Sequence, residues 1–137
     1  MSTIGVGIDL VEVPRVRRML GEKGTHVFER LLTPGEARYC LSKLDPSESV
    51  AVRLATKEAV YKALQSTPAA RGVGWRDIEV VRDENGRPEV VLTGLAQQVA
   101  LQLGVRQVMV SLSHTHEAAI AIALLVSWGG YNSSHPF

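Results

Sequence analysis

The stretch that decides the fold reads Arg53-Leu54-Ala55-Thr56-Lys57-Glu58-Ala59-Val60-Tyr61-Lys62-Ala63-Leu64. It belongs to a helix expected over Ser47–Gln65, because small apolar residues recur there at helical spacing, which marks one buried face. That apolar stripe consists of Val52, Ala55, Ala59 and Ala63. Three of the four are alanine, so we expect this helix to pack very close to its neighbour.

The polar side of this helix carries acid and base together. Glu58 and Lys62 are one turn apart, Lys57 is assigned to the same side, and Arg53 is assigned to its far edge. Taken alone, the pattern most often means an exposed ion pair that contributes about 0.3–0.5 kcal/mol. The alternative is a polar arc that serves chemistry, and periodicity alone does not choose between them.

A glycine-rich strand is expected near the N-terminus. Ile4, Val6, Ile8 and Leu10 alternate with Gly5, Gly7 and Asp9, and the strand is expected to end near Asp9. The glycines would let another backbone approach closely. Gly5-Val6-Gly7 lacks the third glycine of a dinucleotide-binding fingerprint, which excludes that interpretation. Asp9 is then either a capping acid or a second carboxylate of a site.

Helix signals follow this strand. Pro14 suits the first turn of a helix that runs to about Glu22, and Thr25–Leu32 predicts a second short helix. Thr33, Pro34 and Glu36 form the signature of a capping box, which predicts a helix to about Lys43.

The second half of the chain mixes strands and helices. A loop is expected over Ser66–Gly74, and a hairpin over Asp77–Arg82 and Pro88–Leu92 with Asn85-Gly86 at its turn. A helix over Gly94–Leu103, with Gly104 as its C-cap, precedes strands over Val108–Ser113 and Ala118–Val126. This order predicts an α+β domain over residues 1–128. The tail, residues 129–137, has no pattern and is expected to be disordered or foreign to the domain.

Composition narrows the class of protein. The 137 residues fit one domain, with 45% hydrophobic and 21% charged residues and a net charge of +1, so no global field points to nucleic acid or membrane. The single Cys40 cannot form an internal disulfide and is expected to be a buried thiol. No secretory signal and no apolar run of membrane-spanning length is present in the sequence, which makes the cytoplasm the expected compartment.

Two further polar groups stand out. Ser111, Ser113, His114 and Thr115 cluster at a strand end, where a histidine is more often structural; no nucleophile elbow surrounds either serine, which excludes a serine hydrolase. Residues 14–30 hold five basic and two acidic side chains, a local excess of +3. This is either a solvated helix face or a docking surface for an acidic partner. Nucleic acid is a poor alternative, because no RNA-binding aromatic pattern is present.

Together these segments resemble the holo-acyl-carrier-protein synthase family of 4′-phosphopantetheinyl transferases. The resemblance covers residues 4 to about 125 in the family's order, and the ordered set is far more specific than any one segment. The matching segments are Gly5–Val13, Phe28–Glu36, Arg53–Leu64, Trp75–Val80, Asn85–Pro88 and Val110–Thr115. The resemblance implies a 4′-phosphopantetheinyl transferase-like fold, in which a mixed antiparallel sheet packs with helices, and a homotrimer with active sites at its subunit interfaces.

The resemblance also assigns roles to individual residues. Asp9 and Glu58 would be the carboxylates of a Mg²⁺ site, and Lys62 would contact the pyrophosphate of coenzyme A. The nucleotide and its 3′-phosphate would be held by Arg53, His114 and Thr115, and a neighbouring subunit's hairpin would reach the adenine end with Asn85, Gly86 and Pro88. The acidic helix of an acyl carrier protein would dock on Arg15, Arg18 and Met19.

The implied reaction moves the 4′-phosphopantetheine arm of coenzyme A onto a serine of apo acyl carrier protein and releases 3′,5′-ADP. Asp9, Glu58 and Lys62 would be its catalytic residues, with Glu58 acting through a metal-bound water as the first candidate for the base and a metal hydroxide alone as the second. The alternative is a non-catalytic coenzyme A-binding module of the same fold. Its support is the segment after Gln65, which lacks the family's usual glycine-rich run.

Overall fold

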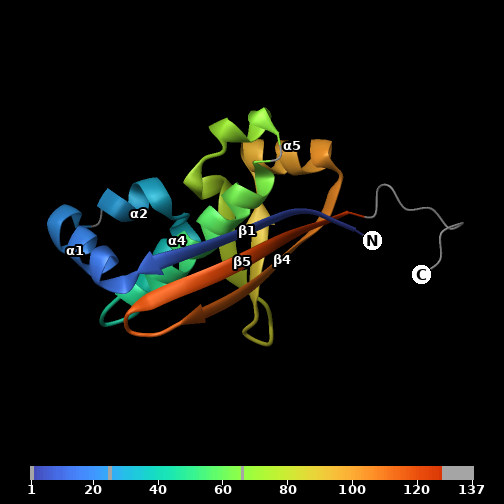
Figure 1. Ribbon diagram of the computed structural model, residues 1–137. Helices are drawn as coiled ribbons and strands as arrows, with labels where there is room; N and C mark the ends of the chain where they lie inside the picture. The colour runs from blue at the N-terminus through green and yellow to red at the C-terminus, as the bar shows by residue number, and fades with distance from the viewer. Residues whose placement is uncertain (1, 25, 66, 128–137) are drawn as a thin grey trace, which may run out of the picture.

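The computed structural model describes residues 2–24, 26–65 and 67–127, and this part of the chain has the expected α+β composition (Figure 1). The tail expected at 129–137 lies outside it. The strands are β1 (Ser2–Glu12), β2 (Ile78–Arg82), β3 (Pro88–Leu92), β4 (Val105–His114) and β5 (Ala118–Ser127). The helices are α1 (Val13–Lys23), α2 (His26–Leu31), α3 (Pro34–Leu41), α4 (Ser47–Leu64) and α5 (Gly94–Leu103).

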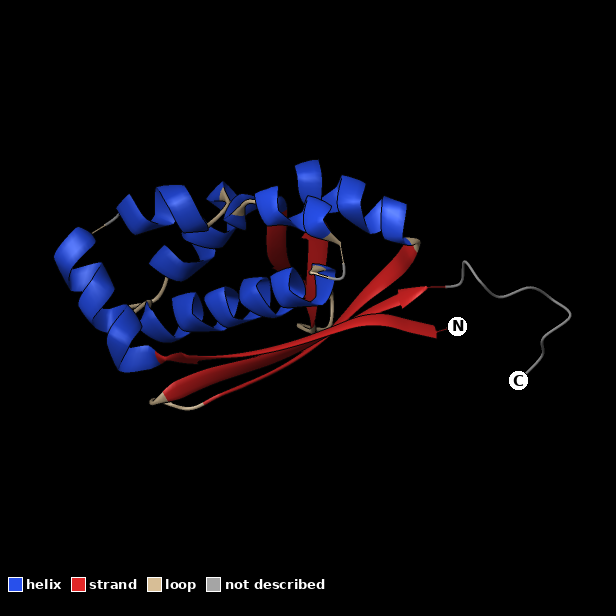
Figure 2. Ribbon diagram, turned by 45° about the horizontal axis from the view of Figure 1, so that its top comes forward, coloured by secondary structure: helices blue, strands red, loops and turns tan. Residues whose placement is uncertain are grey.

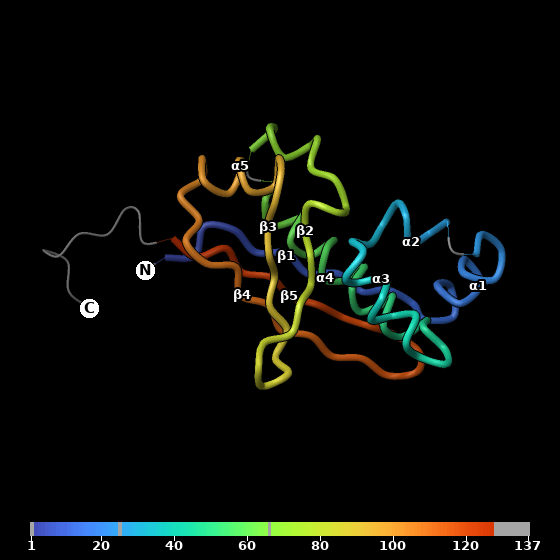
Figure 3. The backbone as a smooth tube through the Cα atoms, turned by 180° about the vertical axis from the view of Figure 1, so that it is seen from behind, coloured from blue at the N-terminus to red at the C-terminus, as the bar shows by residue number. Residues whose placement is uncertain are grey.

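The strands form two antiparallel sheets rather than one. The larger has the order β1-β5-β4, and the hairpin β2-β3 forms the smaller. The turn of this hairpin protrudes at one side of the molecule (Figure 3). β1 does not end near Asp9 as predicted, because β5 continues the pairing as far as Glu12, opposite Ala118. Asp9 therefore lies within a strand, opposite Ala121.

Helix α4 packs against the larger sheet as its alanine stripe predicted. Ala55 and Ala59 have no exposed surface. A methyl group added to Gly7 would collide with the backbone of Ala59, and one added to Gly5 would collide with that of Ala63. The two glycines therefore let β1 lie directly on α4, and Figure 2 shows the helices gathered on one face of this sheet.

Other local predictions met mixed outcomes. The capping box is confirmed: the Glu36 N–H donates to Thr33 Oγ1 at 3.2 Å, and the Thr33 N–H donates to Glu36 Oε1 at 3.0 Å. Cys40 is fully buried, and burial raises the pKa of its thiol. The loop expected over Ser66–Gly74 instead contains a 3₁₀-helix, η1 (Pro68–Gly72), and a second one, η2 (Trp75–Asp77), follows it and delays the start of β2 by one residue. Proline and glycine predicted that α4 ends before this segment, but a short 3₁₀ turn has no periodic sequence pattern that would predict it. In the described ranges no helix is long and apolar enough to cross a membrane.

Candidate active site

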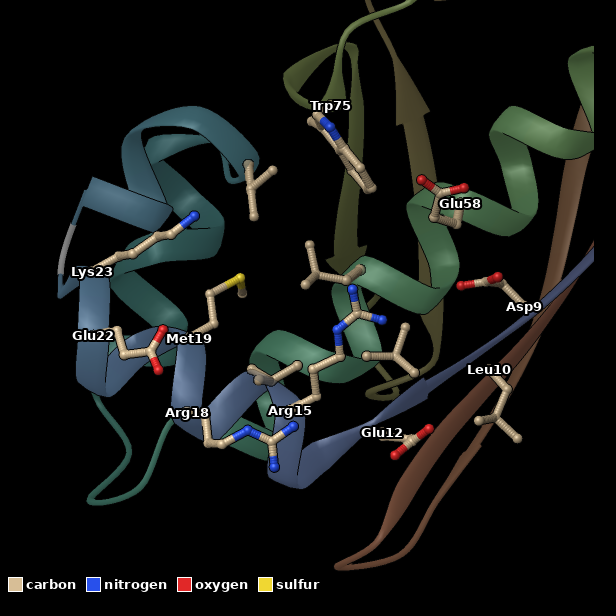
Figure 4. Close-up of a pocket in the computed structure, with 14 residues that line it drawn as sticks. Asp9, Leu10, Glu12, Arg15, Arg18, Met19, Glu22, Lys23, Glu58 and Trp75 are labelled. Atoms are coloured by element: carbon tan, nitrogen blue, oxygen red, sulfur yellow. The ribbon is translucent and has the colours of Figure 1, made fainter.

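A cavity of about 590 Å³ lies where β1, α1 and α4 meet. It brings together five residues singled out by the sequence: Asp9 on β1, Glu58 on α4, and Arg15, Arg18 and Met19 on α1. Figure 4 shows the carboxylates of Asp9 and Glu58 on one side of the cavity and the α1 side chains on the other. The two groups are adjacent because β1 runs directly into α1.

Lys62 pairs with Asp9 rather than with Glu58. Its Nζ lies 2.8 Å from Asp9 Oδ1 and also donates to the carbonyl oxygen of Ile8 at 3.1 Å. The hydrogen bond with Asp9 raises the pKa of Lys62. A simple Glu58–Lys62 surface pair, the more frequent interpretation of this spacing, is therefore wrong. The helical wheel could not reveal the true partner, because it comes from a strand that is distant in sequence.

Glu58 lies in an environment that disfavours its charge. Burial raises the pKa of its carboxyl, and the negative charge of Asp9 raises it further, while Lys62 partly offsets both effects. Two carboxylates that repel each other at a cavity are a suitable donor set for a divalent cation. Within the described ranges no three His, Cys, Asp or Glu side chains cluster as a metal site. Magnesium still fits, because it takes one or two carboxylates and fills its other positions with water and substrate phosphates.

Lys57 is not on the polar side of α4 beside Glu58. It is fully buried, and its Nζ lies 2.7 Å from Oε1 of Glu36, which is also buried. It also donates to the carbonyl oxygens of Trp75, at 2.9 Å, and Ile78. The prediction failed because α4 is covered on more than one side, so a polar position on the wheel need not face solvent. Lys57 thereby fixes the backbone at Trp75.

Trp75 is a cavity residue that sequence reasoning did not assign to a site. Its ring borders the cavity near Glu58, and Leu54 and Met19 add apolar surface (Figure 4). Trp75 lies in the short helix η2, where no periodicity identifies a functional position.

Another cavity, of about 480 Å³, holds three of the residues expected to bind the nucleotide, namely Arg53, Pro88 and His114. Arg53 does not share an exposed arc with Glu58 and Lys62. It is 3% exposed, its Nη1 donates to the Ser49 carbonyl oxygen at 3.1 Å, and its guanidinium lies 4.4 Å from the centre of the Tyr39 ring. Its buried Nε has no hydrogen-bond partner among the residues that the structure describes. Lys43 and Arg82 also line this cavity, together with Asp45 and Glu48, so its charge is mixed and an anion would bind on the side of the basic side chains.

Three expected binding residues line neither of these cavities. Asn85 and Gly86 lie in the β2–β3 turn, where the Asn85 N–H donates to Asp83 Oδ1 at 2.8 Å and Gly86 has a φ of 78°. Thr115 fixes the β4–β5 turn, since its Oγ1 accepts from the N–H groups of Glu117 and Ala118. Within one chain, these residues are not brought to Asp9.

The fold and the two cavities define an enzyme that acts on a phosphate-bearing substrate, with paired carboxylates and a lysine at one cavity and basic side chains at the other. Comparison with known proteins makes this specific. The sequence profile of the 4′-phosphopantetheinyl transferase superfamily matches residues 5–123. The chain belongs to this superfamily.

The relatives agree in name and in length. A holo-[acyl-carrier-protein] synthase of Koribacter versatilis is 45% identical over 89% of this chain and 97% of its own. One of Moorella thermoacetica is 43% identical over 88% and 92%. The crystal structure of the Neisseria meningitidis holo-[acyl-carrier-protein] synthase superposes with a TM-score of 0.81 at 26% identity, over 92% of this chain and all of that one. The Bacillus anthracis synthase, solved in complex with coenzyme A (3′,5′-ADP), gives 0.73 at 32% identity over 91% and 97%. The chain is a phosphopantetheinyl transferase.

Proposed function

We propose that this transferase moves the 4′-phosphopantetheine arm of coenzyme A onto a serine of apo acyl carrier protein at the cavity that holds Asp9 and Glu58. The observation that carries this proposal is the meeting of Asp9, Glu58 and Lys62 beside an α1 face that bears Arg15 and Arg18. The carboxylates and the lysine could bind a pyrophosphate through a metal ion, and the arginines could bind an acidic protein beside it. The cytoplasm, expected from the sequence, is the proposed compartment.

Asp9 and Glu58 would hold Mg²⁺. The ion would neutralise charge on the pyrophosphate of coenzyme A. Burial and then the negative charge of Asp9 raise the pKa of Glu58, and a cation between the two carboxylates would relieve their repulsion. Glu58 would also be the base for the proton of the carrier serine, acting through a metal-bound water.

Lys62 would serve the leaving side of the reaction. Its ammonium is half exposed and is held by Asp9 and by the Ile8 carbonyl, so it is oriented at the cavity edge without being buried. There it would stabilise negative charge on the departing 3′,5′-ADP. Transfer of this kind depends chiefly on positioning and charge stabilisation, and no protein nucleophile is required.

The carrier protein would dock on α1. Arg15 and Arg18 would meet its acidic helix, while Met19 offers an adaptable apolar contact. The same cavity also bears Glu12 and Glu22, so its charge is mixed and the docking depends on the two arginines in particular.

The nucleotide end of coenzyme A would bind in a neighbouring copy, in the cavity that contains Arg53 and His114. The hairpin of that copy, with Asn85, Gly86 and Pro88, would reach the adenine, and Thr115 would help to hold the phosphate. Support for a homotrimer comes from the larger sheet. Its face away from the helices exposes large apolar side chains, which a monomer would leave in water. They are Val6, Ile8, Leu10, Met109, Ile120 and Ile122.

Intact-mass spectrometry tests the reaction. Apo acyl carrier protein is incubated with this protein, coenzyme A and magnesium, with and without EDTA. The expected result is a gain of one phosphopantetheinyl group that EDTA prevents. Coenzyme A binding without any gain in mass, across several carrier proteins, would instead support the non-catalytic module.

Asp9→Ala and Glu58→Ala should each abolish this gain in the mass of the carrier protein, while the circular dichroism spectrum remains unchanged. Turnover by both variants would refute the metal site.

A further inference from the structure

A carboxylate shared by two histidines lies at the edge of the cavity that contains Arg53. Glu48, in the first turn of α4, faces the turn between β4 and β5. His114 Nδ1 lies 3.2 Å from Glu48 Oε1, and His116 Nδ1 lies 3.2 Å from Glu48 Oε2. The hydrogen bond from His116, and then that from His114, lowers the pKa of the Glu48 carboxyl, which keeps it charged.

The backbone that carries both histidines is held in place. His114 is the last residue of β4 and pairs with Ala119 of β5. The Thr115 N–H donates to the Ala118 carbonyl oxygen at 2.8 Å, and Thr115 Oγ1 caps the turn. Because each carboxylate oxygen serves one ring, the plane of the Glu48 carboxylate is fixed from both sides.

His114 points its other ring nitrogen away from this contact. Nε2 has no hydrogen-bond partner within the described ranges, and His114 lines the cavity together with Lys43, Arg53 and Arg82. The buried Nε of Arg53 also lacks a partner there. The open Nε2 of His114 beside the cationic side chains of Lys43 and Arg82 suits this part of the cavity to a phosphate.

We propose that Glu48 is a positioning residue: it holds His114 by Nδ1 so that Nε2 is presented to the 3′-phosphate of coenzyme A. The inference rests on the proposed binding of the nucleotide end in this cavity. It adds a residue that acts through the imidazole ring of His114.

The proton count defines the state of His114 in this arrangement. To donate from Nδ1 to Glu48 and from Nε2 to a phosphate oxygen, His114 must carry both ring protons. Glu48 would then accept from one side of the ring and the phosphate from the other. Asp45, the other acid at this cavity, is paired with Arg17 at 3.3 Å.

Calorimetric titration with two ligands tests the proposal. Coenzyme A carries the 3′-phosphate, and dephospho-coenzyme A lacks it. The wild-type protein should bind coenzyme A more tightly than dephospho-coenzyme A. Glu48→Ala should weaken coenzyme A by about 3- to 10-fold, the range expected for one hydrogen bond, and leave dephospho-coenzyme A unchanged. Glu48→Gln retains an acceptor and should restore most of the preference.

The control is Glu117→Ala, which removes a carboxylate from the same turn that contacts neither histidine. It should leave both affinities unchanged. A wild-type preference for coenzyme A that survives Glu48→Ala would overturn the positioning role alone. Equal wild-type affinity for both ligands would overturn that role together with the proposed placement of the nucleotide end.

A spectroscopic measurement separates positioning from general stability. In the free protein at high pH, the ¹⁵N shifts of His114 should report a proton on Nδ1. Glu48→Ala should move that proton toward Nε2, and Glu117→Ala should not. Unchanged ¹⁵N shifts in Glu48→Ala would show that the carboxylate does not set the ring, and would overturn the inference.

Discussion

Two lysines on α4 show how far the environment, rather than the residue type, sets a side chain's role. Lys57 is fully buried against Glu36, and Lys62 is half exposed beside Asp9. Burial lowers the pKa of Lys57, whereas the hydrogen bond with Asp9 raises that of Lys62. The first lysine therefore supports the fold and the second remains available to substrate.

Their removal should separate these roles. Lys57→Met leaves the Glu36 carboxylate buried without its cation and should lower the free energy of unfolding by about 3–5 kcal/mol. Lys62→Met should lower it by about 0–1 kcal/mol, because its pair is partly solvated. Urea unfolding followed by circular dichroism measures both. Adding Glu36→Gln to Lys57→Met should recover part of the loss, and equal losses in the two single variants would contradict this account.

The Glu58 carboxyl should titrate above its ordinary value of 4.5. A raised folded-state pKa favours the protonated form in the folded protein, so its contribution to stability is present below 4.5 and is lost as pH rises through the folded pKa. Activity should show the opposite trend, since the proposed roles need the ionised form. Carbon-13 NMR of the side chain measures the pKa directly. Asp9→Asn should lower it and Lys62→Met should raise it, and a shift of either in the other direction would contradict the assigned causes.

At this scale the sequence predicted which residues lie close together better than how they pair. Asp9, Glu58, Arg15 and Met19 meet at one cavity, as the resemblance implied. Spacing along α4 wrongly grouped Arg53 and Lys57 with Glu58. A helical wheel does not show that other elements cover α4 from more than one side, so it cannot tell which polar positions face solvent. Glu48 was missed because its partners are more than 60 positions away.

At the scale of elements, the close contact of β1 with α4 sets the distance between Asp9 and Glu58. Gly7→Ala should force the strand away from the Ala59 backbone, with a loss of about 1–3 kcal/mol in stability and a reduced kcat. The control is Gly21→Ala on α1, where an added methyl meets no atom within 4 Å. It should be neutral or should stabilise by up to about 1 kcal/mol. Thermal unfolding and a transfer assay measure both, and a fully active Gly7→Ala would show that the contact does not set the site.

Elements with strong local signals were predicted well. The capping box located the start of α3, and the Asn85-Gly86 turn located the hairpin. The end of β1 and the two 3₁₀-helices were missed, because β1 is extended by pairing with a distant strand and the 3₁₀ turns lack a periodic pattern.

At the scale of the whole molecule, the uncovered face of the larger sheet should hold the oligomer together. Ile8 is 56% exposed there, opposite Ile122, which is 39% exposed. Ile8→Glu would place a charge in an apolar interface and should yield monomers in analytical ultracentrifugation. Because the substrate site is proposed to need two copies, transfer activity should be lost when the protein no longer assembles. Leu101→Glu on α5 is the control, since Leu101 is 69% exposed, lies on a helix rather than on this face, and lines neither of the two cavities. Unchanged assembly in Ile8→Glu would remove this face as the interface.

The separation of the two cavities gives the sharpest test of a shared site. Asp9→Ala should inactivate the carboxylate cavity of its own chain, and Arg53→Met should weaken the basic cavity while keeping much of its apolar bulk. If the proposed homotrimer forms its sites between copies, each variant alone should be nearly inactive. Mixed trimers should regain about one quarter of wild-type activity at equal proportions, since each interface then needs an intact Asp9 on one side and an intact Arg53 on the other. The measurement is transfer activity after joint unfolding and refolding, with separately refolded proteins as the control. A mixture no more active than its parts would mean that each chain builds its site alone.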